Sequence, residues 1–218
     1  MDGTGTLFGR FINALPAGLE AQVIEYSREV EQSYDQLLEH VRARLPTEPF
    51  VLVAESFSGP LAIRLAAEPP VGLKAVALVA TFHRRPVGRG LAALRPFVRA
   101  PMFEFFTPDF VIRRLMEGAD DGLIRSLRAA VSSVRSGVLA KRVRESIAVD
   151  VTTDANRAKV PTLYLGAHED RLLRSGLATE FRALNPALVV TGLEGPHLLL
   201  QVKPSESAAV IARFSMNL

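Results

Sequence analysis

The stretch from Phe50 to Ala67 constrains the fold of this 218-residue chain more than any other. It begins with a continuous apolar run, Phe50 to Val53, which follows Pro49 and contains β-branched residues. Such a run is typical of a strand that is buried on both faces of a parallel sheet. From Leu61 onward, the apolar residues have the spacing of a well-buried helix. We therefore predict a strand that turns directly into a helix.

Between this strand and this helix lies the sequence A-E-S-F-S-G, residues 54–59. A serine at the centre of such a tight turn is the layout of a nucleophile elbow, in which the residues two before and two after the serine must be small. Ala54 and Ser58 stand at those positions, and Pro60 falls in the first helical turn, where its missing N–H has no cost. The helix N-terminus would point free N–H groups at an anion that forms beside Ser56. The alternative is that Ser56 is an ordinary loop serine.

The composition indicates one globular domain, because 218 residues suffice for one α/β core but not for two. The chain has no apolar run of transmembrane length, and its N-terminus lacks the regions of a signal peptide. Without cysteine it forms no disulfide and has no thiolate nucleophile. The net charge of +3 is mild and gives no nucleic-acid footprint. We expect a cytoplasmic protein without stable membrane insertion, and the sequence leaves its oligomeric state open.

Apolar periodicity predicts strands and helices that alternate on both sides of the elbow. The expected strands span 21–26, 50–53, 73–80, 162–165 and 187–191, and the expected helices about 7–14, 34–45, 61–67, 175–184 and 204–214. Ser33, followed three residues later by Gln36, has the capping-box signature of a helix start. Alternation of this kind predicts an α/β fold with a mostly parallel central sheet, helices on both faces and right-handed crossovers.

The alternation is interrupted between about residues 83 and 150, where no strand is evident. This stretch is rich in arginine and contains apolar clusters at Phe97–Val98, Met102–Phe103, Phe105–Phe106, Val111–Ile112 and Leu115–Met116. We expect several helices here, inserted after a strand to form a cap over the sheet edge within one domain of residues 1–218. The alternative is that these helices are the outer layer of the core.

A nucleophilic serine needs a base, and the base needs an orienting acid. Of the four histidines, His197 lies in a Gly-Pro-His loop after the last predicted strand, and Asp170 follows the preceding strand. Both are expected at the carboxyl edge where Ser56 projects, and the chain order Ser, Asp, His is that of α/β-hydrolases. Each residue also has a structural interpretation: His197 as a loop residue and Asp170 as a helix cap. Glu169 is an alternative acid.

Over nearly its full length the chain therefore resembles the α/β-hydrolase family. The resemblance rests on A-E-S-F-S-G at 54–59, L-G-A-H-E-D-R at 165–171, G-P-H at 195–197 and D-G-T-G at 2–5. It implies Ser56 as nucleophile, His197 as general base and then acid, and Asp170 as the residue that orients the histidine. It also implies that the N–H of Phe57 is one donor of the oxyanion hole.

The D-G-T-G segment looks like the loop of small hydrolases in which P-G-x-D-G-T-G follows a strand and supplies a second oxyanion donor. The resemblance places Met1 and Asp2 at that position. Family members have a strand before this loop, whereas this chain begins at Met1. We expect either that the natural protein extends upstream or that the strand is missing, which would leave the elbow strand with an unpaired edge and the loop frayed. In the second case we expect a poor esterase.

Two functional hypotheses follow. The first is a serine hydrolase that cleaves small-molecule carboxylic esters of small to medium acyl chains through an acyl-enzyme, with no metal or organic cofactor. The apolar cap favours an acyl or aromatic group, although thioesters, lactones and carbon–carbon substrates use the same machinery. The second is a non-catalytic small-molecule-binding protein on a hydrolase scaffold, because a fold does not fix a function.

Overall fold

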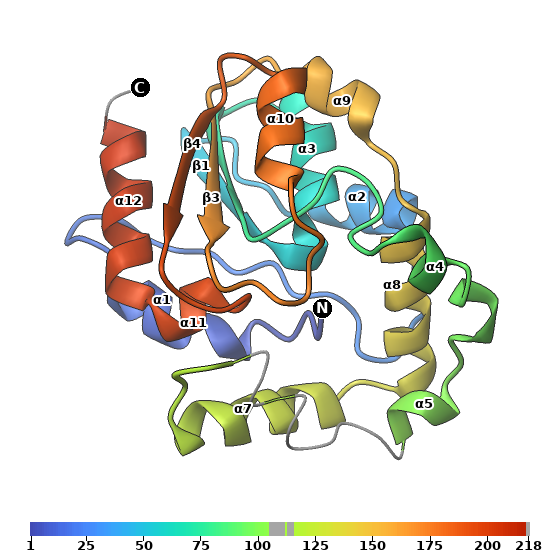
Figure 1. Ribbon diagram of the computed structural model, residues 1–218. Coiled ribbons are helices and arrows are strands. Elements are labelled where there is room, and N and C mark those ends of the chain that lie inside the picture. The colour runs from blue at the N-terminus through green and yellow to red at the C-terminus, as the bar shows by residue number, and fades with distance from the viewer. Residues whose placement is uncertain (105–111, 113–115, 217–218) are drawn as a thin grey trace.

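The computed structural model describes residues 1–104, 112 and 116–216 (Figure 1). Within these residues one sheet of four parallel strands forms the centre of the fold, in the order β1-β2-β3-β4. The strands are β1 (Phe50–Glu55), β2 (Leu73–Val79), β3 (Thr162–Ala167) and β4 (Val189–Leu193). All four carboxyl ends therefore meet at one edge, and the predicted parallel α/β sheet is confirmed.

Helices cover both faces of the sheet because successive strand residues point to opposite sides. Val76 and Leu78 of β2 belong to one apolar core, and Ala77 and Val79 to another. The first core is completed by α2 (Tyr34–Arg42), α3 (Gly59–Ala67), α9 (Thr152–Asn156) and α10 (Leu177–Leu184). The second is completed by α1 (Gly9–Asn13), α11 (Leu199–Val202) and α12 (Pro204–Met216), with the 3-10 turn η1 (Thr6–Phe8) before α1.

Helix α2 begins with the capping box that the sequence predicts. The Ser33 hydroxyl accepts a hydrogen bond from the Gln36 backbone N–H at 3.3 Å. In return, the Gln36 side chain accepts one from the Ser33 backbone N–H at 2.9 Å. Two of the N–H groups that a helix start leaves unpaired are thereby satisfied, and Leu37, Leu38 and Val41 are buried against the sheet.

The prediction of a strand over 21–26 is wrong, because these residues run without regular secondary structure. A strand exists only with a hydrogen-bonded neighbour, and β1 pairs with β2 alone in the described residues. The backbone of Tyr26 instead donates to the carbonyl of Gly3 at 2.8 Å. For the same reason β1 is less buried than its sequence suggests: Phe50 to Val53 are only half-buried, since β1 lies at an edge of the described sheet.

Between β2 and β3 the chain forms α4 (Arg89–Ala92), the 3-10 turn η3 (Arg95–Phe97), α5 (Pro101–Glu104), α7 (Asp121–Ser132) and α8 (Ser136–Ala148). The two ends of this region lie side by side. Arg84 and Asp150 form an isolated antiparallel β-bridge, and the Val151 N–H donates to the His83 carbonyl at 2.7 Å. Helix α7 lies across the carboxyl edge of the sheet (Figure 1). Of the predicted apolar clusters in this region, residues 105, 106, 111 and 115 lie outside the described residues.

Among the described residues, no helix combines the length and apolar character that crossing a membrane requires.

Candidate active site

The turn after β1 holds Ser56 in an unusual backbone conformation. Ser56 has a φ of 53°, a left-handed value that costs free energy for any residue with a Cβ. The chain passes through the 3-10 turn η2 (Ser56–Ser58) and enters α3 directly. Thr81, just after β2, donates its hydroxyl to the Ser56 carbonyl. A Cβ on Gly59 would lie 1.9 Å from the Thr81 hydroxyl oxygen, so the turn can close only with glycine there.

The three residues of the predicted triad form one hydrogen-bonded chain. The Oγ of Ser56 lies 2.7 Å from the Nε2 of His197. The Nδ1 of the same ring lies 2.7 Å from the Oδ2 of Asp170. His197 is buried, and its two ring nitrogens are both occupied by these partners. The arrangement can move a proton from the serine hydroxyl to an imidazole that a carboxylate holds in place.

Asp170 is held in place by its own backbone environment. Its Oδ1 accepts hydrogen bonds from the N–H groups of Leu172 and Leu173 at 2.8 and 3.0 Å, which leaves Oδ2 for His197. Burial raises the pKa of Asp170, but the hydrogen bonds from His197 and from the two backbone N–H groups outweigh it, so the pKa is lowered overall. Asp170 therefore caps the turn that follows it and also faces the imidazole.

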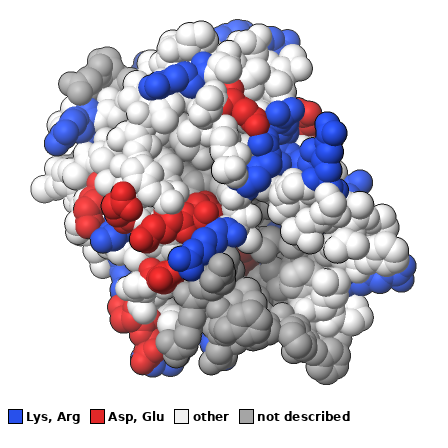
Figure 2. Space-filling model, viewed as in Figure 1, with Lys and Arg blue, Asp and Glu red and all other residues white. Residues whose placement is uncertain are grey.

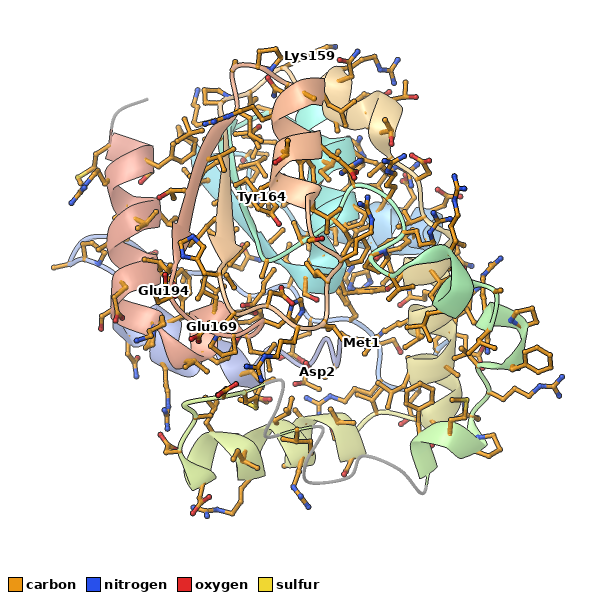
Figure 3. The ribbon with its side chains drawn as sticks, viewed as in Figure 1. Met1, Asp2, Lys159, Tyr164, Glu169 and Glu194 are labelled. Atoms are coloured by element: carbon orange, nitrogen blue, oxygen red, sulfur yellow. The ribbon has the colours of Figure 1, made fainter. Side chains whose placement is uncertain are left out.

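The alternative acid, Glu169, does not make the carboxylate contact to His197, which comes from Asp170. Glu169 is exposed, and its backbone N–H donates to the Gly195 carbonyl at 3.0 Å (Figure 3). The neighbouring His168 pairs with Glu194 at 2.8 Å on the surface. Of the residues singled out from the sequence, the structure thus brings together Ser56, His197 and Asp170, and it leaves Glu169 outside.

Phe57, the residue after Ser56, is fixed by two tyrosines. Its ring stacks on Tyr34 with centroids 4.8 Å apart and meets the edge of Tyr26 at 6.2 Å. The Tyr34 hydroxyl donates to the Phe57 carbonyl at 2.9 Å. The peptide groups that follow Ser56 are therefore rigidly placed at the entrance of α3.

The D-G-T-G loop is anchored rather than frayed. The Oδ1 of Asp2 accepts the Thr4 N–H at 3.0 Å and the Thr4 hydroxyl at 2.6 Å. The buried guanidinium of Arg142, on α8, donates to the carbonyls of Met1 and Asp2 at 2.9 and 2.6 Å. Met1 and Asp2 lie between the sheet edge and α7 (Figure 3). These hydrogen bonds hold the first residues of the described chain in that position.

Two residues near the site were missed from the sequence. The first is Glu55, which accepts hydrogen bonds from the Leu200 N–H at 3.1 Å and the Gln201 side chain at 2.8 Å. This joins the turn at Ser56 to α11, which follows His197 closely. Burial raises the pKa of Glu55 despite these hydrogen bonds. The sequence signal that could have indicated this buried role is an acidic residue at the end of an apolar strand.

The second missed residue is Arg142, whose signal was its spacing. It follows Val138 and Leu139 by four and three residues, so it lies on the buried face of α8. Its guanidinium also donates to the Ser27 carbonyl at 2.7 Å and lies over the ring of Tyr26. Arg142 thus joins α8 to the first two residues of the chain and to the segment at Ser27.

Charged side chains gather mainly in two places on the face that Figure 2 shows. Asp and Glu are the more frequent at the lower left, and Lys and Arg at the upper right. Within the ranges that the structure describes, no group of three or more His, Cys, Asp or Glu residues could hold a metal ion.

The fold is that of the α/β-hydrolases, as comparison with solved structures shows. No protein-family model and no curated protein matches the sequence. A hydrolase from Oleispira antarctica has a TM-score of 0.80 at 11% identity, covering 100% of this chain and 89% of that one. MenH from S. aureus has a TM-score of 0.77 at 16% identity, with 100% and 91% covered. A lipase-esterase related protein from Clostridium acetobutylicum has a TM-score of 0.71 at 12% identity, with 96% and 88% covered.

Proposed function

We propose that the protein is a serine hydrolase that cleaves carboxylic esters of small to medium acyl chains. The observation that carries the proposal is the chain of two 2.7 Å contacts from Ser56 through His197 to Asp170. An ordinary loop serine is not expected to contact a buried imidazole that a carboxylate also holds. This combination is the one that activates a hydroxyl as a nucleophile.

In the proposed mechanism the Ser56 Oγ attacks the ester carbonyl carbon while the Nε2 of His197 accepts the hydroxyl proton. The negative charge of Asp170 stabilises the imidazolium that forms. His197 then donates the proton to the departing alcohol, which leaves an acyl-enzyme on Ser56. A water molecule, activated by the same imidazole, attacks the acyl carbonyl and releases the acid.

The oxyanion of each tetrahedral intermediate needs donors that are already in place. The Phe57 N–H is the first candidate, because its residue is clamped by Tyr26 and Tyr34 directly after the nucleophile. The backbone at Met1 and Asp2 is the second candidate, since Arg142 and Thr4 hold that loop beside the sheet edge. Thioesters and lactones would react through the same steps, so the acyl carbonyl is the shared element of the substrate class.

A fluorophosphonate probe tests the nucleophile, because it forms a covalent bond with an activated serine. We expect wild type to be labelled and to hydrolyse p-nitrophenyl esters, and Ser56→Ala to do neither while it keeps its far-UV circular dichroism spectrum. Ser126→Ala, which removes an exposed hydroxyl on α7, is the matched control and should be labelled like wild type. Equal labelling of wild type and Ser56→Ala would remove Ser56 from the proposed role.

The length of the acyl group is tested with an ester series from acetate to dodecanoate. We expect kcat/KM to be highest among the short and medium chains. A protein that binds these esters without turning any of them over would instead be a binding protein on a hydrolase scaffold.

A further inference from the structure

A large apolar groove runs along β1, and its volume is about 1110 Å³. We call it the β1 groove and define it by its two walls, which are β1 itself and the extended segment 19–26. Helices line it from both faces of the sheet. The apolar side chains that cover it include Val41, Leu45 and Leu61 from one core and Phe11, Leu15 and Ile211 from the other.

Both walls of the β1 groove carry backbone groups without a strand partner. In a parallel sheet, alternate N–H and C=O groups of a strand point to opposite sides, and β1 is paired on one side only within the described chain. On the opposite wall, residues 20–24 make no backbone hydrogen bond to any described residue. Peptide groups in apolar surroundings cost free energy until they are hydrogen-bonded.

The β1 groove is large enough to hold one strand. Six extended residues, the length of β1, span about 20 Å, and a strand takes up about 4.8 Å between its neighbours and about 10 Å between covering layers. Together these dimensions give a volume on the order of 1000 Å³, which is close to that of the groove. A fatty acyl chain could fill the same apolar volume but would leave both rows of peptide groups unpaired.

We propose that the β1 groove binds one extended, apolar strand of polypeptide from outside these 218 residues, inserted between β1 and segment 19–26. The strand would pair with both walls and lengthen the sheet by β-strand addition. Because apolar side chains cover the groove from both faces, a strand that fits is a continuous run of Val, Ile, Leu or Phe rather than an alternating one. The inference is independent of the proposed hydrolase activity.

A designed peptide tests the proposal directly. The probe has a six-residue core of Val and Ile, two Lys at each end for solubility, and a fluorescein label. A second peptide carries N-methyl groups on alternate core residues, which keeps its apolar character and removes hydrogen-bond donors. We expect the first peptide to bind one to one by fluorescence anisotropy, and hydrogen exchange of the β1 amides to slow about tenfold or more. The N-methylated peptide should bind at least about tenfold more weakly.

Two protein variants locate the binding. Val23 lies in the wall of the groove and is 37% exposed, so Val23→Asp places a charge there without emptying the core. Val30 is 58% exposed and lies outside the groove, so Val30→Asp is the matched control. We expect Val23→Asp to weaken the peptide about tenfold and Val30→Asp to leave its affinity unchanged.

Four results would overturn the proposal. Equal binding of the N-methylated peptide would show that the groove selects apolar volume alone, as for an acyl chain. Palmitate that displaces the peptide and protects the β1 amides equally well would show the same. A dimer whose β1 amides are already protected without peptide would assign the edge to a second copy of this chain. Absence of peptide binding, with unprotected β1 amides, would show that the groove accepts no strand.

Discussion

The guanidinium of Arg142 donates a 2.6 Å hydrogen bond to the backbone carbonyl of Asp2, 140 positions away in the sequence. The same side chain reaches Met1 and Ser27, so one buried cation is satisfied by three carbonyls. Burial lowers the pKa of Arg142, while the Coulomb field of Tyr26 and Asp2 opposes this. Helix α8 thus holds the loop that lies between the sheet edge and α7.

Replacing Arg142 should affect both stability and turnover. Arg142→Met leaves three carbonyls without their donor, and we expect a loss of about 3 kcal/mol in the free energy of unfolding, measured in urea. Arg142→Lys should recover part of the stability but little of kcat, because an ammonium cannot reproduce the fork of a guanidinium. The control is Arg135→Met, which removes an exposed arginine next to the same helix. Indistinguishable unfolding midpoints for Arg142→Met and Arg135→Met would contradict the positioning role.

Asp170→Asn should keep the fold and lower kcat on the order of ten-thousand-fold, because an amide neither stabilises the imidazolium nor selects its tautomer. Glu169→Gln is the matched control, since it makes the same chemical change one residue away on an exposed side chain. We expect it to retain nearly all activity in an ester hydrolysis assay. Loss of activity in Glu169→Gln with retention in Asp170→Asn would reverse the assignment of the acid.

Protonation of His83 should make the free energy of unfolding depend on pH in the mildly acidic range. Burial lowers the pKa of this histidine to about 4, although Glu180 lies 3.4 Å from its Nε2. In the unfolded chain a histidine titrates near pH 6.5. Between about pH 6.5 and pH 4 the unfolded state therefore binds a proton that the native state does not, so stability falls as the pH is lowered through this window. The neighbouring Glu180 has a pKa of about 2, mainly because Arg174 donates to it, and stays charged throughout.

The measurement is the urea midpoint of wild type and of His83→Gln from pH 7 to pH 4. Groups common to both proteins cancel in the difference between the two curves. We expect the wild-type midpoint to fall more steeply than that of the variant. Parallel curves would show that His83 is as easily protonated in the native state as in the unfolded chain.

Gly59→Ala should strongly destabilise the fold, because the new Cβ would overlap with Thr81. We expect a loss of at least about 3 kcal/mol together with lower turnover, since Thr81 also holds the Ser56 carbonyl. Gly9→Ala is the control: its site is open, its backbone is helical, and alanine there should stabilise the protein by about 0.5–1 kcal/mol. Thermal denaturation of the two variants separates these expectations, and a similar Tm for both would contradict the close packing at the turn.

Much of this architecture could be predicted because its signals are local. The capping box at Ser33, the small residues around Ser56 and the apolar runs of β2 and β3 each depend on neighbours in the sequence. Ser56, Asp170 and His197 each follow a predicted strand. Because the described strands are all parallel, the three loops meet at one sheet edge, as predicted.

The prediction that failed and the two residues that were missed all depend on distant partners. Residues 21–26 have the composition of a strand, but a ladder also needs a neighbour, which no local pattern reports. The same holds for Glu55, whose partners are some 145 residues away, and for Arg142, which bonds to the other end of the chain. Their buried positions could be suspected from spacing, but the groups that satisfy them could not.

The backbone of Ser56 has a consequence for any attempt to make this protein more heat-resistant. Holding a residue with a Cβ at a φ of 53° costs on the order of 1–3 kcal/mol, and the rest of the turn enforces that value. Glycine adopts the same conformation without this cost. A laboratory selection that scores variants by melting temperature alone would therefore favour Ser56→Gly, so at this one position the most heat-resistant variant is expected to lack the hydroxyl that we propose as the nucleophile.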